Sequence, residues 1–378
     1  MKQIVFFIAS IAFNLLKVFP VKKRRIIMEC DYGKGFYGNL LYIYNEMQRE
    51  KLDYEIIIPV NKNVEINQVK LGENTKVVKT KGFMHMFYLA TSSMWITNNH
   101  YYFFLRKRKN TLMINTWHAM GVFKTFAMDS AKSQQEREKY IMDSKNIDYL
   151  LVSSDKVKDI YSKALNIPEQ KILDMGVPRT DPLFDKEYIR KERLNFEDEN
   201  PCLKGRKLIL YAPTFRDDEK EYFNMQLDLR EMKRRLGTEY GVILKIHPII
   251  RHPFKIEEEL KDFVYDFSKH NINDLMISSD MLITDYSSVI FEYALLEKPM
   301  FFYAYDYHKY KENIRGFYFD YEEFIPGKRL NTTEEVIEEI EKVEDKNYDM
   351  ENIRKFAKEF CHYTDGKSSE RFVNRFLK

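Results

Sequence analysis

Two patterns of apolar and polar residues alternate along the chain. Short apolar runs are typical of buried parallel strands, and the segments between them carry apolar residues at the spacing of a helix face. This alternation predicts an α/β fold built from parallel sheets covered by helices. In the first half of the chain we expect strands at residues 25–28, 54–59, 94–97, 111–115 and 149–153, and helices at residues 37–49, 134–145 and 155–165.

The pattern breaks between residues 181 and 206, where charged residues accompany Pro182 and Pro201. Such a stretch is typical of a linker between domains. Beyond it we expect strands at residues 208–211, 241–246, 281–284 and 300–303, helices at 228–236 and 288–296, and a largely helical tail from residue 352.

A chain of 378 residues is longer than one ordinary hydrophobic core allows, so we expect two domains. Residues 1–185 are predicted to form an N-terminal Rossmann-like domain, and residues 186–350 a second one. Residues 351–378 are predicted to be C-terminal helices that pack back on the first domain. Because ligands bind at the carboxyl ends of parallel strands, we expect the active site in a cleft across which the domains face each other.

The N-terminal segment is apolar from residue 4 to residue 19, but Asn14 and Lys17 interrupt it. It is shorter than the roughly 20 residues that cross a bilayer, and it lacks the cleavage site of a signal peptide. Two interpretations stay open: a first helix packed on its own domain, or an interfacial helix whose basic neighbours meet anionic lipid. The aromatic run at residues 101–104, followed by four cations at 106–109, likewise fits either a lipid contact or a buried strand.

Charge and cysteine usage argue against several function classes. The net charge of +3 is nearly balanced, which does not favour nucleic acid as a partner. The three cysteines are far apart and form no CxxC pair, so neither a disulfide framework nor a zinc site is supported, and a reducing compartment fits best. Because no cluster of His, Cys and Asp has the spacing of metal ligands, we expect no protein-bound metal and no cofactor.

Two histidines that could carry chemistry follow predicted strands. His118 follows the strand at residues 111–115, and His247 follows the strand at residues 241–246. One imidazole on each domain would allow one ring to take a proton from an attacking hydroxyl while the other stabilises a leaving phosphate. Each histidine also has a plainer interpretation, as a packed or structural residue at the end of its strand.

Serine and arginine residues occupy similar strand-end positions. Ser287 and Ser288 lie between the strand at residues 281–284 and the following helix, where a helix N-terminus offers unpaired amides to a diphosphate. The alternative is an ordinary capped helix without a ligand. Arg179 and Arg216 also lie on strand-end loops, and their forked guanidinium groups fit phosphate oxygens, although exposed salt bridges would explain them equally well.

Several short segments between residues 115 and 371 form an ordered series. They are Trp117-His118, Gly176-Val177-Pro178-Arg179-Thr180-Asp181, Tyr211-Ala212-Pro213-Thr214-Phe215-Arg216, Lys245-Ile246-His247-Pro248, Ile283-Thr284-Asp285-Tyr286-Ser287-Ser288 with Phe291-Glu292-Tyr293, Lys298-Pro299, Gly316-Phe317-Tyr318-Phe319-Asp320-Tyr321 and Asp365-Gly366-Lys367-Ser368-Ser369-Glu370-Arg371. This series resembles the CDP-glycerol glycerophosphotransferases of teichoic acid synthesis.

The resemblance implies a transferase with two Rossmann-like domains of the GT-B type, in which the second domain binds CDP-glycerol and the first faces the acceptor and the membrane. It implies that His118 is the general base and that His247 contacts the diphosphate or the leaving group. Both are predicted catalytic residues. The predicted substrate-binding residues are Lys124, Arg179, Arg216, Thr284, Asp285, Ser287, Ser288 and Glu292.

At residues 117–124 the chain reads Trp-His-Ala-Met-Gly-Val-Phe-Lys, where many polymerases of the family read Trp-His-Gly-Thr-Pro-Leu-Lys. This form is more similar to the primases, which add the first glycerol phosphate to an undecaprenyl-diphosphate-linked disaccharide of N-acetylmannosamine and N-acetylglucosamine (ManNAc-GlcNAc). The resemblance thus implies transfer of sn-glycerol 3-phosphate from CDP-glycerol, with release of CMP, by a peripheral enzyme at the cytoplasmic face of the cell membrane. Three alternatives stay open: a polyglycerol phosphate or ribitol phosphate polymerase of the family, a GT-B glycosyltransferase that uses a nucleotide sugar, and a catalytically idle protein that binds membrane surfaces.

Overall fold

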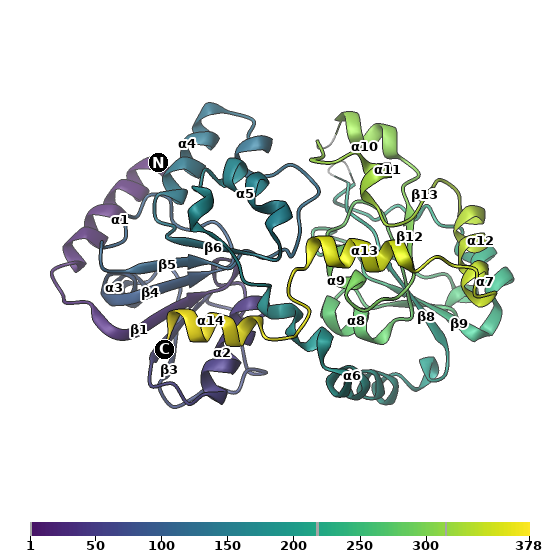
Figure 1. The fold of residues 1–378 in the computed structure, drawn as a ribbon, viewed down its shortest axis with the longest axis horizontal. Coiled ribbons are helices and arrows are strands. Elements are labelled where there is room, and N and C mark those ends of the chain that lie inside the picture. Colours follow the sequence, from purple (N-terminus) through teal and green to yellow (C-terminus); the bar gives the residue numbers. More distant parts are fainter. Residues whose placement is uncertain (1, 217–218, 314–315) are drawn as a thin grey trace. The chain divides into compact units, whose positions relative to one another are not determined.

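The computed structural model describes residues 2–216, 219–313 and 316–378, and contacts within the chain divide them into two compact units (Figure 1). The first unit contains the chain up to Met120 together with Phe126–Asp181 and Asp365–Lys378. The second contains Gly121–Thr125 and Pro182–Thr364. Each unit is an α/β domain around a parallel sheet, which confirms the predicted fold class.

The first unit is built around the strands β1 (Lys22–Glu29), β2 (Glu55–Val60), β3 (Thr75–Lys79), β4 (Ser92–Thr97), β5 (Leu112–Asn115), β6 (Tyr149–Val152) and β7 (Ile172–Asp174). These strands are parallel and lie in the order β3-β2-β1-β4-β5-β6-β7. Its helices include α1 (Lys2–Leu16), α2 (Gly38–Arg49), α3 (Phe83–Thr91), α4 (Gln134–Ser144), α5 (Lys158–Leu165) and α14 (Ser368–Phe376).

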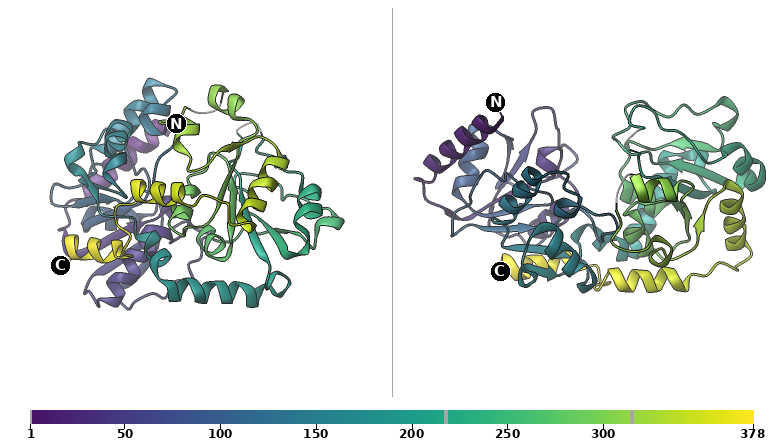
Figure 2. Two further views of the ribbon diagram at one scale, coloured as in Figure 1. Left: turned by 45° about the vertical axis from the view of Figure 1, so that its right-hand side comes forward. Right: turned by 90° about the horizontal axis from the view of Figure 1, so that it is seen from above.

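The second unit is built around the strands β8 (Lys207–Ala212), β9 (Tyr240–Leu244), β10 (Val264–Asp266), β11 (Met281–Thr284), β12 (Met300–Tyr303) and β13 (Arg329–Leu330), which lie parallel in the order β10-β9-β8-β11-β12-β13. Helices α7 (Leu229–Leu236) and α12 (Thr333–Glu344) cover one face of this sheet, and α8 (Ile272–Ser278) and α9 (Val289–Ala294) cover the other (Figures 1 and 2). Further helices are α6 (Lys186–Glu199), α10 (Tyr307–Asn313), α11 (Tyr321–Phe324) and α13 (Glu351–Phe360).

The first strand illustrates why apolar runs form the sheets. β1 exposes its first three residues, whereas Ile26 and Met28 are fully buried among the side chains of α2 and α14. Trp95 of the neighbouring strand β4 points to the opposite face, where its ring lies 6.1 Å from that of Phe13 in α1. Because helices cover both faces, successive apolar side chains are buried although they point in opposite directions.

The helices and strands predicted from the apolar pattern are present, with ends shifted by a few residues. The strands that the pattern missed are β3, β7, β10 and β13, which are the edges of the two sheets in the described chain. An edge strand pairs on one side only and is less covered, so it needs no continuous apolar run. β3 reads Thr-Lys-Val-Val-Lys, and none of its five residues is buried.

The boundary between the two units, between Asp181 and Pro182, lies in the stretch 181–206 that was predicted as a linker, but an irregular linker is wrong, because most of the stretch folds as helix α6. Asp185 begins this helix, and its carboxylate accepts from the amide of Glu187 (3.0 Å). Phe196 is the buried residue of α6, while most of its other side chains are charged and accessible. A helix that buries so little shows a weak apolar period, which explains the error.

The aromatic run at residues 101–104 forms a loop rather than a strand. Tyr101 is buried, and the ring of Phe104 stacks on that of Phe6 in α1, with centroids 4.6 Å apart. Phe13 of the same helix is fully buried. Helix α1 therefore packs on its own unit along one side, while its other side remains exposed.

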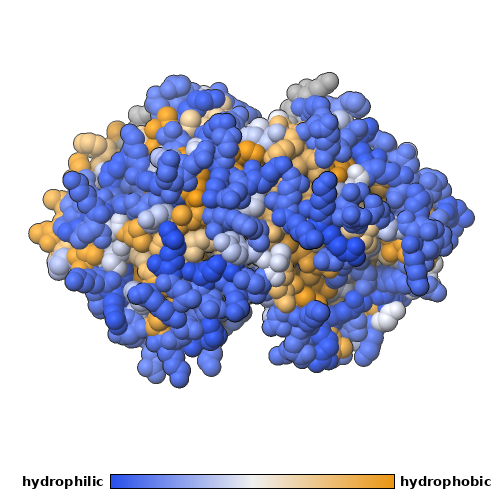
Figure 3. Space-filling model, in the orientation of Figure 1, coloured by the Kyte–Doolittle hydropathy of each residue, from blue (hydrophilic) through white to orange (hydrophobic). Residues whose placement is uncertain are grey.

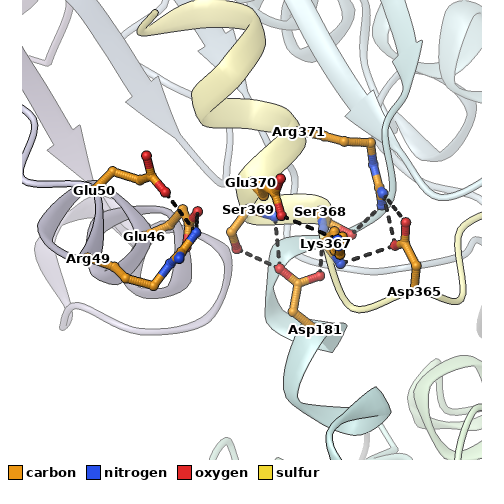
Figure 4. Close-up of polar contacts among 10 residues, drawn as sticks. All are labelled: Glu46, Arg49, Glu50, Asp181, Asp365, Lys367, Ser368, Ser369, Glu370 and Arg371. Atoms are coloured by element: carbon orange, nitrogen blue, oxygen red, sulfur yellow. Dashed lines mark hydrogen bonds and ion pairs between the residues drawn. The ribbon is translucent and has the colours of Figure 1, made fainter.

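The C-terminal helix α14 lies beside α2 and completes the first unit (Figure 4). The carboxylate of Asp181 accepts from the backbone amides of Ser368 and Ser369 (both 2.8 Å) and from the Ser369 hydroxyl (2.7 Å). These bonds satisfy amides that the first turn of a helix leaves without partners, and they place a negative charge at its positive end. Phe372 and Val373 then enter the core of the unit, where both are fully buried.

Replacing Asp181 with Ala should lower the free energy of unfolding of the first unit by about 1–3 kcal/mol, because the amides of α14 lose their acceptor. Urea unfolding followed by circular dichroism measures this loss. Asp365→Ala is the matched control: Asp365 pairs with Arg371 (2.7 Å) at a half-exposed position, so a loss of about 0–1 kcal/mol is expected. Equal losses in the two variants would contradict the capping role of Asp181.

Candidate active site

The strand order of each sheet reverses near its middle. In the first unit the chain runs from β1 outward to β3 and then returns to add β4 beside β1, and in the second it runs from β8 outward to β10 and returns to add β11 beside β8. The connections on the two sides of such a reversal lie on opposite faces, so the loops that follow these strands part and leave space at the carboxyl edge. These two edges are therefore where each unit should bind a ligand.

His118 lies at the carboxyl edge of the first sheet, three residues after the end of β5. Its Nδ1 is 3.1 Å from the carbonyl oxygen of Asn98, the residue that follows β4. A carbonyl only accepts hydrogen bonds, so Nδ1 carries the proton and Nε2 keeps a lone pair. The imidazole is thereby held in the form that can act as a base.

The surrounding protein also sets the proton affinity of His118. Its side chain reaches solvent, yet nearby protein removes enough hydration to lower the pKa of the imidazole. The charge of Arg179 lowers this pKa further, whereas the carbonyl of Asn98 and the charge of Asp31 act in the opposite direction. A lowered pKa keeps the ring unprotonated, and able to accept a proton, at neutral and slightly acidic pH.

The backbone just before His118 is strained. Trp117 has a φ angle of +51°, in the left-handed region that residues other than glycine rarely adopt. The side chain of Asn115 accepts from the Trp117 amide (2.8 Å), and Nδ2 of Asn39 donates to the carbonyls of Thr116 (3.0 Å) and Trp117 (2.9 Å). Such strain persists only where the surrounding contacts fix it, and it is common at functional sites.

Asn39 also joins Arg179 to the loop that carries His118. Its Oδ1 accepts from the backbone amide of Arg179 (3.0 Å), so one buried side chain ties together the two predicted site residues of the first unit. The sequence interpretation missed both Asn39 and Asn98. Asn98 could have been found because it directly follows a predicted strand, whereas Asn39 lies inside a helix and gave no such signal.

In the second unit, Arg216 and Asp285 bridge the two loops at the strand reversal. Arg216 is only 4% exposed, with Nη2 3.0 Å from Asp285 and Nε donating to Asp306 (2.7 Å). Asp285 also accepts from the backbone amide of Thr214 (2.8 Å). Two carboxylates therefore surround a guanidinium that the sequence predicted to contact substrate, and the pairing fixes the loops on either side of the reversal.

Three hydroxyl residues follow β11 at the same edge. The Thr284 hydroxyl is buried and donates to the carbonyl of Ala212 (2.7 Å), which ties the ends of β11 and β8 together. Ser287 accepts from the amide of Val289 at the start of α9 (3.4 Å). Ser288 precedes that helix without a side-chain capping bond, and both serines are partly accessible.

Lys124 and Glu292 belong to the second unit as well. Lys124 lies in the segment Gly121–Thr125, which the chain inserts into this unit between two stretches of the first. An antiparallel bridge joins Lys124 to Phe317. Glu292 is 2% exposed on α9, so its carboxylate faces protein rather than solvent.

His247 is exposed, three residues after the end of β9. The amide of Ile249 donates to its Nδ1 (3.1 Å), so a neutral ring carries its proton on Nε2. Its ring lies against that of Phe215, with centroids 4.7 Å apart. The two predicted catalytic histidines thus differ in chemistry, because Nε2 accepts a proton in His118 and donates one in His247.

The predicted residues therefore form two groups, one in each unit. His118 and Arg179 lie in the first, and the second holds Lys124, Arg216, His247, Thr284, Asp285, Ser287, Ser288 and Glu292. Within either unit taken by itself, the described residues place no three His, Cys, Asp or Glu side chains close enough to share a metal ion.

Comparison with known proteins gives a consistent result. A family model described as CDP-glycerol:poly(glycerophosphate) glycerophosphotransferase matches residues 11–378. The teichoic acid poly(glycerol phosphate) polymerase of Bacillus spizizenii W23 is 35% identical over 387 residues, which cover 98% of this chain and 96% of that protein. The teichoic acid ribitol-phosphate primase of the same strain is 37% identical over 308 residues, 78% of each chain.

Two further comparisons concern length and fold. The teichoic acid glycerol-phosphate primase of Bacillus subtilis 168 is 30% identical over 98% of this chain and 95% of its own, whereas the chain covers only 50% of the poly(glycerol phosphate) polymerase of that strain. The solved structure of the wall teichoic acid polymerase TagF has a TM-score of 0.85 and 29% identity, over 99% of this chain and 94% of that one. A variant of TagF soaked with CDPG gives the same TM-score, 0.85.

Proposed function

Because this chain belongs to the CDP-glycerol:poly(glycerophosphate) glycerophosphotransferase family, a family of enzymes, we propose that it transfers sn-glycerol 3-phosphate from CDP-glycerol to a hydroxyl of a lipid-linked acceptor in wall teichoic acid synthesis. The observation that carries this proposal is the Nε2 lone pair of His118 at the carboxyl edge of the first sheet. Removal of a hydroxyl proton needs an unprotonated base at such a position, and this nitrogen supplies one.

In this proposal His118 activates the acceptor, and His247 assists the departure of CMP from the donor. Nε2 of His118 takes the proton of the acceptor hydroxyl, whose oxygen attacks the phosphorus that bears glycerol. The bond from this phosphorus to the bridging oxygen breaks, and CMP leaves with the electron pair. The Nε2–H of His247 and the partly accessible Ser287 and Ser288 donate to the oxygens on which negative charge builds up.

His118→Ala should lower kcat by about 10²- to 10⁴-fold, because a positioned base contributes that much, while CDP-glycerol still binds. Release of CMP measures turnover, and calorimetry measures donor binding. His270→Ala, which removes an exposed imidazole beside Phe267, is the control and should keep normal turnover. Near-normal turnover of His118→Ala would contradict the proposal.

The dependence of activity on pH is a separate test. Since the pKa of His118 is lowered from 6.5, activity should fall only as the pH drops below 6.5.

We propose the primase reaction, a single transfer to the undecaprenyl-diphosphate-linked disaccharide ManNAc-GlcNAc. The motif Trp117-His118-Ala119-Met120-Gly121 supports this, because it is more similar to primases than to polymerases. A polymerase is the second candidate, and the 35% identity to a poly(glycerol phosphate) polymerase over nearly the whole chain favours it. The 37% identity to a ribitol-phosphate primase makes CDP-ribitol the donor to compare with CDP-glycerol.

Product masses separate these candidates. The purified protein is incubated with a synthetic lipid-linked disaccharide and, in separate reactions, with CDP-glycerol, CDP-ribitol or a UDP-sugar. A single added glycerol phosphate is the expected result. A ladder of masses would indicate a polymerase rather than a primase. Transfer from the UDP-sugar alone would indicate a glycosyltransferase rather than a glycerophosphotransferase.

We propose that the protein attaches peripherally to the cytoplasmic face of the cell membrane, and helix α1 supports the contact with a membrane. In the described chain no helix is both long and apolar enough to cross a bilayer. Yet Ile4, Phe7 and Ile8 on the outer side of α1 are each about 60% exposed or more, and Figure 3 shows hydrophobic side chains gathered on that side of the first unit. Apolar side chains on the outer side of a packed helix need an apolar partner of their own, and the hydrocarbon edge of a membrane would be one.

Phe7→Asp combined with Ile11→Asp should weaken binding to vesicles that contain anionic lipid, because charges replace the apolar surface that enters the membrane. Co-sedimentation with vesicles measures the bound fraction. Asn14→Asp, on the same helix, adds a negative charge without removing apolar surface and is the control. Wild-type binding by the double variant would contradict the role of α1.

A further inference from the structure

A large, open apolar cavity lies between helix α1, helix α3 and the loop after β4 in the first unit. It has a volume of about 950 Å³, at the upper end of the roughly 300–1,000 Å³ that ligand pockets occupy. Its walls are almost entirely apolar and include Phe6 and Ala9 of α1, Met86 of α3, and Phe104 and Leu105 of the following loop. A cavity of this size and lining suits a hydrocarbon chain.

Polar groups gather where the cavity meets the carboxyl edge of the sheet. Tyr101 and Tyr102 line the cavity, and their hydroxyls donate to Glu29, the last residue of β1 (2.6 and 2.7 Å). Glu29 is buried, and each of its carboxylate oxygens already accepts a hydrogen bond from the protein. Tyr32 and Lys81 line the cavity as well, and Lys81 supplies a cation that a phosphate group could pair with.

The same loops connect the cavity to the candidate base. Tyr101 and Tyr102 lie three and four residues after Asn98, whose carbonyl orients His118. Tyr32 follows Asp31, which accepts from the side chain of Asn99 (3.0 Å) and whose amide donates to Asn98 (2.8 Å). One continuous set of loops thus forms both the polar end of the cavity and the support of His118.

Helix α1 forms the roof of the cavity and is anchored at both ends. Phe6 stacks on Phe104, and Nη1 of Arg108 donates to the carbonyls of Lys17 and Phe19 just after the helix (2.9 and 2.6 Å). The outer side of the same helix is the exposed apolar surface described above. Val5 and Leu15 of α1 line the cavity and are 61% and 69% exposed, so the cavity opens beside this apolar surface.

We propose that this cavity binds the hydrocarbon chain of the lipid-linked acceptor, with the diphosphate head near Lys81 and the acceptor hydroxyl at His118. This inference rests on the proposed function, and it concerns a single chain bound in a protein cavity rather than contact with a membrane surface. Three observations favour the acceptor over a bulk lipid: the cavity shares its loops with the candidate base, its polar end carries a cation, and its apolar end lies under α1.

Met86→Trp fills the cavity, whereas Met84→Trp makes the same change two residues away, on the exposed side of α3. For an acceptor with a long prenyl chain, Met86→Trp should raise KM at least about tenfold, since displacing even two methylene groups costs that much. Met84→Trp should leave KM unchanged, and both variants should act normally on an acceptor with a short, soluble chain. Ala9→Trp closes the cavity from α1 and should repeat the effect if Met86→Trp does not fold. An unchanged KM for both cavity variants would overturn the proposal.

A binding measurement separates this proposal from the proposed reaction. A prenyl phosphate with a photoreactive diazirine at mid-chain is crosslinked to the wild-type protein, and the labelled residues are mapped by mass spectrometry. Label on Ala9, Met86 or Leu105, lost in Met86→Trp, supports the cavity even if no transfer is observed with any donor. Label confined to Ile4, Phe7 and Ile8 would mean membrane contact only, and would overturn the cavity proposal while leaving the transfer reaction intact.

Discussion

The reversal of strand order in the middle of each sheet is the constraint on which the rest of the structure depends. Right-handed connections between parallel strands place helices on one face before the reversal and on the other after it. The loops beyond β1 and β4, and those beyond β8 and β11, must therefore part. The polar residues of each unit gather at these edges, because the loops that follow neighbouring strands bring their side chains together there around one open space.

Much of this architecture could be predicted from the sequence, because strands covered on both faces need continuous apolar runs. The edge strands escaped prediction for the opposite reason, as β3 shows with its two lysines, and α6 was mistaken for a linker because it buries little more than Phe196. The positions of His118 and His247 after strands were predictable as well. Their proton states were not, since these depend on the carbonyl of Asn98 and the amide of Ile249, two contacts that only the fold creates.

Arg216 has a structural role in addition to the substrate contact predicted for it. Its forked guanidinium fits phosphate in principle, but in the structure two carboxylates, Asp285 and Asp306, flank it. A buried cation with two carboxylate neighbours is costly to disturb and well suited to fixing loops. Asn39 works in the same manner in the first unit, where a neutral side chain holds Thr116, Trp117 and Arg179 at once. Residues that hold the loops in place are as important to these edges as those that could touch a ligand.

The placement of α14 has a consequence for biosynthesis. Phe372 and Val373 belong to the core of the first unit, yet nearly all of the second unit precedes them in the chain. Domains usually fold in the order of their synthesis, but here the core of the first unit can close only after the second unit has been made. Until then its apolar surface stays partly uncovered, which makes the nascent chain a substrate for chaperones.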